Sequence, residues 1–246
     1  MKWTMSTVCK KGGREYNQDY LAAAIGDNTA CFVVCDGLGS YVGSEVASSL
    51  SSNQVIKAYK KHAKMGNMLD EKFMIDTVKE AHNFVTMYKE TNPKIASSCT
   101  TIACVFSDSE RTAIAHIGDS RVYMVRQGKI MHQTKDHSLA QMAVDVGEIS
   151  QHTVRQHKDQ NKLTRVLGSE YFAAPDIRII ESPLQVGDGF LLCTDGWWEY
   201  VYEDEIEAIF SLTNDPQDAI TRMEKRLNKR APSYNDNFSA IIAMVV

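Results

Sequence analysis

Short apolar runs bounded by glycine and polar residues recur along the chain, and they predict a protein rich in β-strands. Residues 30–35, 112–117 and 189–194 show this pattern clearly, and apolar runs of this length between turn residues are typical of buried strands. The same reasoning predicts strands at 3–9, 22–25, 101–106, 121–125, 129–133, 178–182 and 238–246. Gln127-Gly128 lies between two of them and predicts a hairpin turn.

Apolar residues spaced three and four positions apart predict helices elsewhere. One helix is expected over 44–62, where Ser44 stands at the position of a cap. A clearer helix follows Asp70, which is a second candidate cap, and it ends before Pro93. Shorter helices are predicted at 138–146, 205–212 and 218–228. Two long helices followed by many strands are typical of an α+β fold.

The length and composition favour one ordinary globular domain. The chain has 246 residues, a net charge of −4 and scattered Lys and Arg, which argues against a nucleic-acid-binding surface. Its apolar runs are too short for a membrane span, and its N-terminus lacks the apolar core of a signal peptide. We therefore expect a cytoplasmic protein with a single domain, residues 1–246.

One polar stretch, around residues 147–165, has no clear period. A long segment of this kind within a compact domain is usually functional or disordered. It is interpreted as a mobile surface excursion near the functional site. An insertion without a role fits the sequence equally well.

The cysteines exclude one class of metal site. The chain has six, none belongs to a Cys-x-x-Cys pair, and most lie within predicted strands. They are expected to be buried free thiols in a reducing compartment rather than zinc ligands.

Aspartates stand at the ends of several predicted strands. Asp36, Asp119, Asp195 and Asp236 each lie at a strand edge, and the first of them is followed by Gly37, which lets the backbone approach a ligand closely. An isolated Asp-Gly is more often only a turn. Several carboxylates brought together repel one another unless a cation neutralises them. Oxygen ligands alone select hard ions such as Mg²⁺ or Mn²⁺.

Divalent ions held by carboxylates suit the hydrolysis of phosphate esters. The motifs that other classes of phosphatase use for catalysis are missing from this chain. Cys9 and Arg14 are one residue too close for a Cys-x5-Arg loop, no Asp-x-Asp follows a predicted strand, and the residues of a P-loop are missing. A metal-activated water is the nucleophile that remains.

Six short motifs occur in a definite order along the chain. They are Arg14-x-x-Asn17-Gln18-Asp19, Val34-Cys35-Asp36-Gly37-Leu38-Gly39, Ser98-Cys99-Thr100-Thr101, Gly118-Asp119-Ser120-Arg121, Cys193-Thr194-Asp195-Gly196 and Asp236-Asn237. Together they resemble the metal-dependent (PPM, type 2C) serine/threonine protein phosphatases, with the length of a bacterial-type single catalytic domain. The resemblance implies a central antiparallel β-sandwich flanked by pairs of α-helices in four layers, with a flap at the 147–165 stretch.

The resemblance also implies a binuclear site for Mn²⁺ or Mg²⁺. Asp36 would bridge the two ions. Asp195 and Asp236 would complete one of them, and the carbonyl of Gly37 would complete the other together with waters. Asp19 would hold metal-bound waters.

The implied reaction is direct attack of a metal-bound hydroxide on phosphoserine or phosphothreonine, without a covalent intermediate. Arg14 would clamp the substrate phosphate, for which a guanidinium is well suited, although a solvated charge is the alternative. Asp36 and Asp195 would be the other catalytic residues, and Asp119 would help to bind a third, weaker ion. The implied partners are phosphorylated Ser/Thr proteins and a cognate kinase, with no nucleic acid or membrane, and a monomer is expected.

Some residues depart from the family pattern. Leu38 stands where many eukaryotic members have histidine, so a general acid is missing there. Gln18 replaces a frequent glutamate, and Ser40 and Cys99 replace frequent glycines. The source of the leaving-group proton and the water shell of the second ion are therefore open.

Two other functions stay open on the sequence. One is a catalytically weak phosphoprotein-binding regulator of the same fold, and the other is a small-molecule phosphatase. The complete set of aspartates argues against the first, because a binding module has no need of carboxylates that repel one another. His137, Trp197 and Trp198 are interpreted as structural or packing residues.

Overall fold

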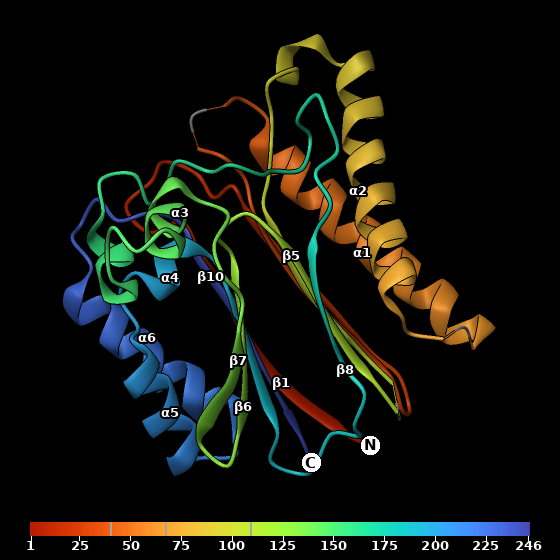
Figure 1. Cartoon of the computed structure of the whole chain (residues 1–246), viewed down its shortest axis with the longest axis vertical. Coiled ribbons are helices and arrows are strands. Elements are labelled where there is room, and N and C mark those ends of the chain that lie inside the picture. The colour runs from red at the N-terminus through yellow and green to blue at the C-terminus, as the bar shows by residue number, and fades with distance from the viewer. Residues whose placement is uncertain (40, 67, 109) are drawn as a thin grey trace.

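The computed structural model describes residues 1–39, 41–66, 68–108 and 110–246 of the chain, so Ser40 lies outside the described residues. The strands within these ranges form two antiparallel five-stranded sheets (Figure 1). The first sheet has the order β1 (Trp3–Lys10), β10 (Phe238–Val245), β9 (Gly189–Cys193), β6 (Arg121–Arg126) and β7 (Lys129–Gln133). The second has the order β2 (Asp19–Ile25), β3 (Ala30–Asp36), β4 (Ile102–Ser107), β5 (Thr112–Ile117) and β8 (Asp176–Ile180).

The two sheets pack face to face, and their central strands are buried on both sides. In β3, Phe32 and Val34 join the core between the sheets, where they meet Ile241 of β10. The alternate side chains Val33 and Cys35 join a second core beneath two helices. A strand covered on both faces has no solvent-facing positions, which explains why it reads as a continuous apolar run.

Helices cover both outer faces of this sandwich (Figure 1). The second sheet is covered by α1 (Ser44–Met65) and α2 (Glu71–Thr91), and the first by α4 (Asp195–Trp198), α5 (Glu203–Leu212) and α6 (Pro216–Arg230). The remaining helical segments are η1 (Pro93–Ile95), α3 (Leu139–Asp145) and η2 (Gln151–Gln156). The predicted α+β architecture of four layers is thereby confirmed. None of the described helices has the length and apolar character needed to cross a membrane.

The start of α2 agrees with the sequence prediction, whereas the start of α1 does not. Asp70 caps α2 as predicted, and its side chain accepts a hydrogen bond from the backbone N–H of Phe73 at 2.7 Å. Ser44 is not a cap, because it is already the first residue of α1. The position before it is Gly43, whose φ is 84°. A Cβ on this glycine would lie 2.1 Å from Ile95, so only glycine fits the turn.

The predicted hairpin between β6 and β7 is confirmed. Gln127 and Gly128 have φ values of 51° and 71°, as a tight turn with two left-handed residues requires. The short helix α4 was not predicted. Its four residues are too few to show a helical period.

Candidate metal centre

The antiparallel register brings the predicted aspartates to one end of the sandwich. Asp19 and Asp36 are direct partners across β2 and β3. In the first sheet, β9 pairs with β6 and β10 in a register that places the loops of Asp119, Asp195 and Asp236 beside one another. Residues from distant parts of the chain therefore meet at one edge.

These strand ends surround a cavity of about 340 Å³. Its wall contains most of the predicted site residues, namely Arg14, Asp36, Gly37, Asp119, Asp195 and Asp236. Asn161 and Leu163 of the 147–165 segment also line it. Part of this segment therefore lies at the cavity, and its role as a mobile flap stays a prediction.

Asp36 is held in place by the strand beside it. Its backbone N–H donates to the Thr101 hydroxyl at 2.9 Å, and its carbonyl accepts hydrogen bonds from the Thr101 N–H at 2.8 Å and the Thr100 hydroxyl at 2.9 Å. The Thr101 hydroxyl also lies 2.6 Å from that of Ser120. Because Ser120 follows Asp119, one threonine links two of the carboxylate-bearing segments.

The carboxylates share a buried and negative environment. Burial, followed by neighbouring carboxylates, raises the pKa of Asp36 and Asp119 well above the usual range. Burial is also the largest cause that raises the pKa of Asp19 to about 7 and that of Asp195 to about 6. Such a cluster is unfavourable in its ionised form unless a cation balances it.

The donor atoms fit a hard divalent ion. The Oδ1 atom of Asp19 is buried and has no hydrogen-bond partner among the described residues, whereas Oδ2 accepts from the Thr194 hydroxyl at 2.9 Å. A buried carboxylate oxygen without a donor is costly unless a cation or an ordered water satisfies it. Together with the carboxylates of the cavity wall, this atom makes the site suitable for a hard divalent ion such as Mn²⁺ or Mg²⁺.

Metal-free protein is expected to lose stability as the pH rises. A carboxyl group with a raised folded-state pKa stabilises the fold below its unfolded pKa, near ~4, and this contribution is lost as the pH passes the folded value. For Asp195 and Asp19 the folded values are about 6 and about 7. Thermal unfolding in EDTA should therefore show a Tm that falls across this range. Asp195→Asn should flatten the decline, and an unchanged slope in that variant would contradict the assignment.

Arg14 lies in the cavity wall and pairs with Asp236. Its Nη2 atom donates to Asp236 Oδ2 at 2.6 Å, and its side chain is 50% exposed. An ion pair this exposed contributes little to stability. The guanidinium is accessible to a ligand in the cavity, which fits the predicted phosphate role better than a purely structural one.

The structure clarifies two departures from the family pattern. Gln18 donates from its backbone N–H to Asn237 Oδ1 at 2.8 Å, and its side-chain Nε2 lies 3.4 Å from Glu45 Oε2. The carboxylate that Gln18 lacks is thus present next to it, in the first turn of α1. Leu38 lines the cavity, and no histidine belongs to the described residues of the wall.

His137 holds the backbone just before Asp119. The backbone N–H of His137 donates to the Gly118 carbonyl at 2.9 Å, and the ring atom Nδ1 accepts from the Gly118 N–H at 3.2 Å. This contact places the ring proton on Nε2, which lies 3.3 Å from the Asp176 carboxylate. These contacts agree with the structural role expected for His137.

A second group of metal-ligand side chains lies outside the cavity. His116, His137 and Asp176 have ligand atoms within 4.8 Å of one another. The Arg165 guanidinium is 2.7 Å from the Asp176 carboxylate and 3.3 Å from His137 Nε2. Because this guanidinium already supplies a positive charge, the group needs no metal ion.

Glu199 lies one helical turn after Asp195, near the site, although it is not among the residues that line the cavity and the sequence did not indicate it. Burial, followed by the carboxylates of Asp195 and Asp236, raises its pKa to about 8. Gln160 of the 147–165 segment donates to its Oε1 atom at 2.5 Å. In the sequence, Glu199 follows Asp195 by the length of one helical turn. This spacing indicates that the two side chains are neighbours only when the segment is known to be the helix α4.

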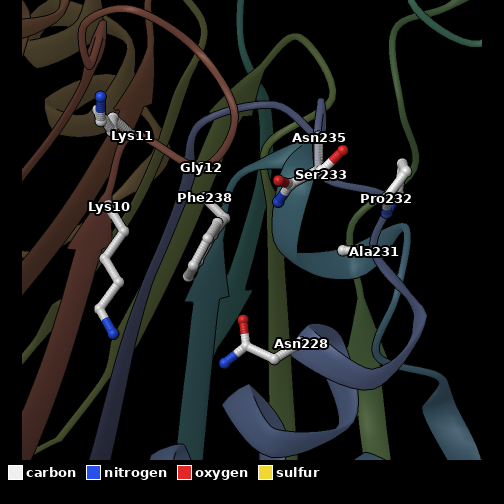
Figure 2. A pocket seen from close by; sticks show the side chains of 9 residues that line it. All are labelled: Lys10, Lys11, Gly12, Asn228, Ala231, Pro232, Ser233, Asn235 and Phe238. Carbon is white, nitrogen blue, oxygen red and sulfur yellow. The ribbon is translucent and has the colours of Figure 1, made fainter.

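A separate groove of about 510 Å³ lies between the end of β1 and the C-terminal end of α6 (Figure 2). Phe238 and Asn228 point into it, whereas Lys11 points away. Its described lining includes none of the predicted metal ligands. The functional site is therefore assigned to the aspartate-lined cavity.

Comparisons of the sequence with a family profile and with known proteins indicate the same family. A sequence profile described as Protein phosphatase 2C matches residues 11–233. The serine/threonine phosphatase stp of Listeria monocytogenes serotype 4b is 30% identical over 184 residues, which cover 74% of this chain and 72% of that protein.

Solved structures share the fold over the whole chain. The serine/threonine phosphatase Stp1 of Staphylococcus aureus matches with a TM-score of 0.85 and 23% identity, covering 100% of this chain and 96% of that one. The catalytic domain of the phosphatase PstP, solved in complex with two manganese ions, matches with a TM-score of 0.79 and 23% identity, covering 99% and 98%. At 23% identity, these two matches show that the fold is shared, and nothing more.

Proposed function

The chain belongs to the protein phosphatase 2C family, and we propose that it removes phosphate from phosphoserine and phosphothreonine residues of proteins. The nucleophile in this proposal is a hydroxide activated by two divalent ions, Mn²⁺ or Mg²⁺, and no covalent phosphoenzyme forms. A cognate Ser/Thr kinase, whose phosphorylation the enzyme reverses, and a monomeric state belong to the same proposal.

The proposed roles of the site residues are those that the family resemblance implies, and their positions at the cavity support them. Asp36 would bridge the two ions, Asp195 and Asp236 would complete one, and the Gly37 carbonyl would contribute to the other. Asp19 would order water through its unpaired Oδ1 atom. The ions would supply the activated water and neutralise charge on the phosphoryl oxygens. That the PstP structure contains two manganese ions supports the capacity of this fold for such a pair.

The observation that carries the proposal is the convergence of buried carboxylates on one cavity that also contains a guanidinium. Asp36, Asp119 and Asp195 line it, and burial raises the pKa of each. Arg14 would hold the substrate phosphate there, since a planar guanidinium forms paired hydrogen bonds with phosphate oxygens. A protein that only binds phosphoproteins would gain nothing from carboxylates that destabilise its fold.

Two substrates with and without metal test the proposal. p-Nitrophenyl phosphate and a phosphothreonine peptide should both be hydrolysed with Mn²⁺, and neither should be hydrolysed in EDTA. Turnover of p-nitrophenyl phosphate without turnover of phosphopeptides or phosphoproteins would favour a small-molecule phosphatase. Phosphopeptide binding without any turnover would favour a regulator.

Asp119→Ala is expected to impair the phosphopeptide much more than p-nitrophenyl phosphate. With Leu38 in the wall in place of a histidine, the leaving group would take its proton from water near Asp119, where a third, weaker ion is proposed, or would leave with little help. A threonine alkoxide needs that proton, whereas p-nitrophenolate leaves without it. The measurement is kcat for both substrates at saturating Mn²⁺. Equal losses would show that Asp119 supports the site in general, and no loss would make it a turn residue.

A further inference from the structure

Trp198 is fully buried beside the proposed metal centre. Its indole N–H donates to the backbone carbonyl of Asp119 at 2.8 Å. Trp198 is also the last residue of α4, whose first residue is Asp195. One helical turn therefore carries a proposed ligand and also holds the backbone of a second one. This hydrogen bond adds to the pairing of β6 with β9, in which Arg121 faces Cys193, in fixing the spacing between Asp119 and Asp195.

Two arginines hold the indole ring. The guanidinium carbon of Arg121 lies 3.6 Å from the centroid of the Trp198 ring, and that of Arg155 lies 5.7 Å away. Both distances are within the range in which a cation is attracted to an aromatic face. Arg121 is itself fixed, because its Nε and Nη2 atoms donate to the Asp136 carboxylate at 2.8 and 2.7 Å.

Arg155 connects this stack to the 147–165 segment. It lies in η2, and its Nη2 donates to both carboxylate oxygens of Glu203 at 2.6 Å. Glu203 is the first residue of α5 and also accepts from the Tyr123 hydroxyl at 3.2 Å. The side chain of Arg155 is only 12% exposed, whereas that of Glu203 is 39% exposed, so the arginine end of this attachment point is buried and the carboxylate end is partly exposed. Figure 1 shows the green segment that contains it next to α4.

We propose that Trp198 is a positioning residue that couples attachment of the 147–165 segment to ion binding at Asp119. Pairing of Arg155 with Glu203 holds the indole, and the indole N–H holds the Asp119 carbonyl. Loss of either contact would let the Asp119 backbone move relative to Asp195, which would weaken binding of the third ion proposed at Asp119. This inference rests on the proposed function, because it presupposes an ion at Asp119.

Trp198→Phe tests the hydrogen bond, and Trp197→Phe is its matched control. Both tryptophans are fully buried, but the Trp197 indole nitrogen has no hydrogen-bond partner among the described residues. Equilibrium Mn²⁺ binding, followed by the electron paramagnetic resonance of free Mn²⁺, is the readout. Trp198→Phe should raise the Mn²⁺ concentration that half-saturates the weakest site by roughly three- to tenfold, the range for one lost hydrogen bond. Trp197→Phe should change it less than about twofold.

Kinetic measurements distinguish a positioning role of Trp198 from general damage to the active site. The Trp198→Phe variant should recover most of its kcat for the phosphothreonine peptide at saturating Mn²⁺, because the ligands themselves are intact. A loss of kcat that excess Mn²⁺ does not restore would overturn the positioning role.

Arg155→Met tests the link to the 147–165 segment, with Arg155→Lys as the variant that keeps the charge. Arg155→Met should raise the half-saturating Mn²⁺ concentration in the same direction and add little to Trp198→Phe, because residues acting through one contact are not additive. Independent, multiplying effects would overturn the coupling, and so would equal effects of the two tryptophan variants. Wild-type protein that binds no Mn²⁺ would instead refute the proposed function itself.

Discussion

Asp36→Asn is expected to lower kcat for both p-nitrophenyl phosphate and a phosphothreonine peptide by roughly 10³-fold or more, about 4 kcal/mol. Asp36 is proposed to bridge two ions, and a neutral amide cannot replace a carboxylate between two cations. Its backbone stays fixed by Thr101, so the loss comes from the side chain alone. Steady-state kinetics at several Mn²⁺ concentrations, together with direct Mn²⁺ binding, measure the effect.

The fold of this variant should survive. Burial and neighbouring carboxylates raise the pKa of Asp36 in the metal-free protein, so removing its charge relieves repulsion, and the Tm in EDTA should be at least that of wild type. Asp27→Asn is the matched control, because Asp27 is exposed beyond the other end of β2 and should leave activity and Tm unchanged. Wild-type activity that persists in excess EDTA would refute the metal mechanism.

Arg14→Ala is expected to lower kcat/KM by a ΔΔG‡ of roughly 2–4 kcal/mol, the range for truncating one partner of a desolvated charge pair. The guanidinium is proposed to hold the substrate phosphate. Its present partner is Asp236, at 2.6 Å. Removing it leaves Asp236 free for an ion, so Mn²⁺ affinity should not fall. Kinetics on both substrates and Mn²⁺ titration measure the two effects.

Two variants make this test specific. Arg14→Lys keeps the charge but loses the paired hydrogen bonds of a guanidinium, so its loss of kcat/KM should be intermediate. Arg222→Ala removes an exposed arginine of α6 that pairs with Asp218, and its kinetics should match wild type. Unaltered kinetics of Arg14→Ala would show that Arg14 is a solvated surface charge.

Most of the strands and long helices could be predicted because their signals are local. The central strands are covered on both faces, so they appear as uninterrupted apolar runs, and β5 and β7 begin and end where the sequence predicted. Asp70 was identified as a cap from its place before an apolar period. Ser44 failed as a cap because the left-handed turn at Gly43, packed against Ile95, decides where α1 begins.

The aspartates of the candidate site were also visible in the sequence, because each follows or precedes a recognisable strand. A site for hard divalent ions could be predicted from these carboxylates alone, because such ions prefer oxygen ligands that lie close together. Family motifs then gave the order of the ligands and the expectation of two ions. The residues that hold those ligands were not visible. Thr101 and Ser120 are 19 positions apart in the chain, and no local pattern links their hydroxyl groups.

The sequence by itself determined the α+β class, the family and the expectation of metal-dependent chemistry, because composition, periodicity and short motifs are properties of neighbouring residues. Tertiary structure alone decided that Arg14 pairs with Asp236, that Glu199 lies near Asp195, and that Trp198 holds Asp119. The physical reason is register. Which strand ends lie side by side depends on pairing between segments far apart in the chain, and a side chain's partner and pKa depend on what that pairing places around it.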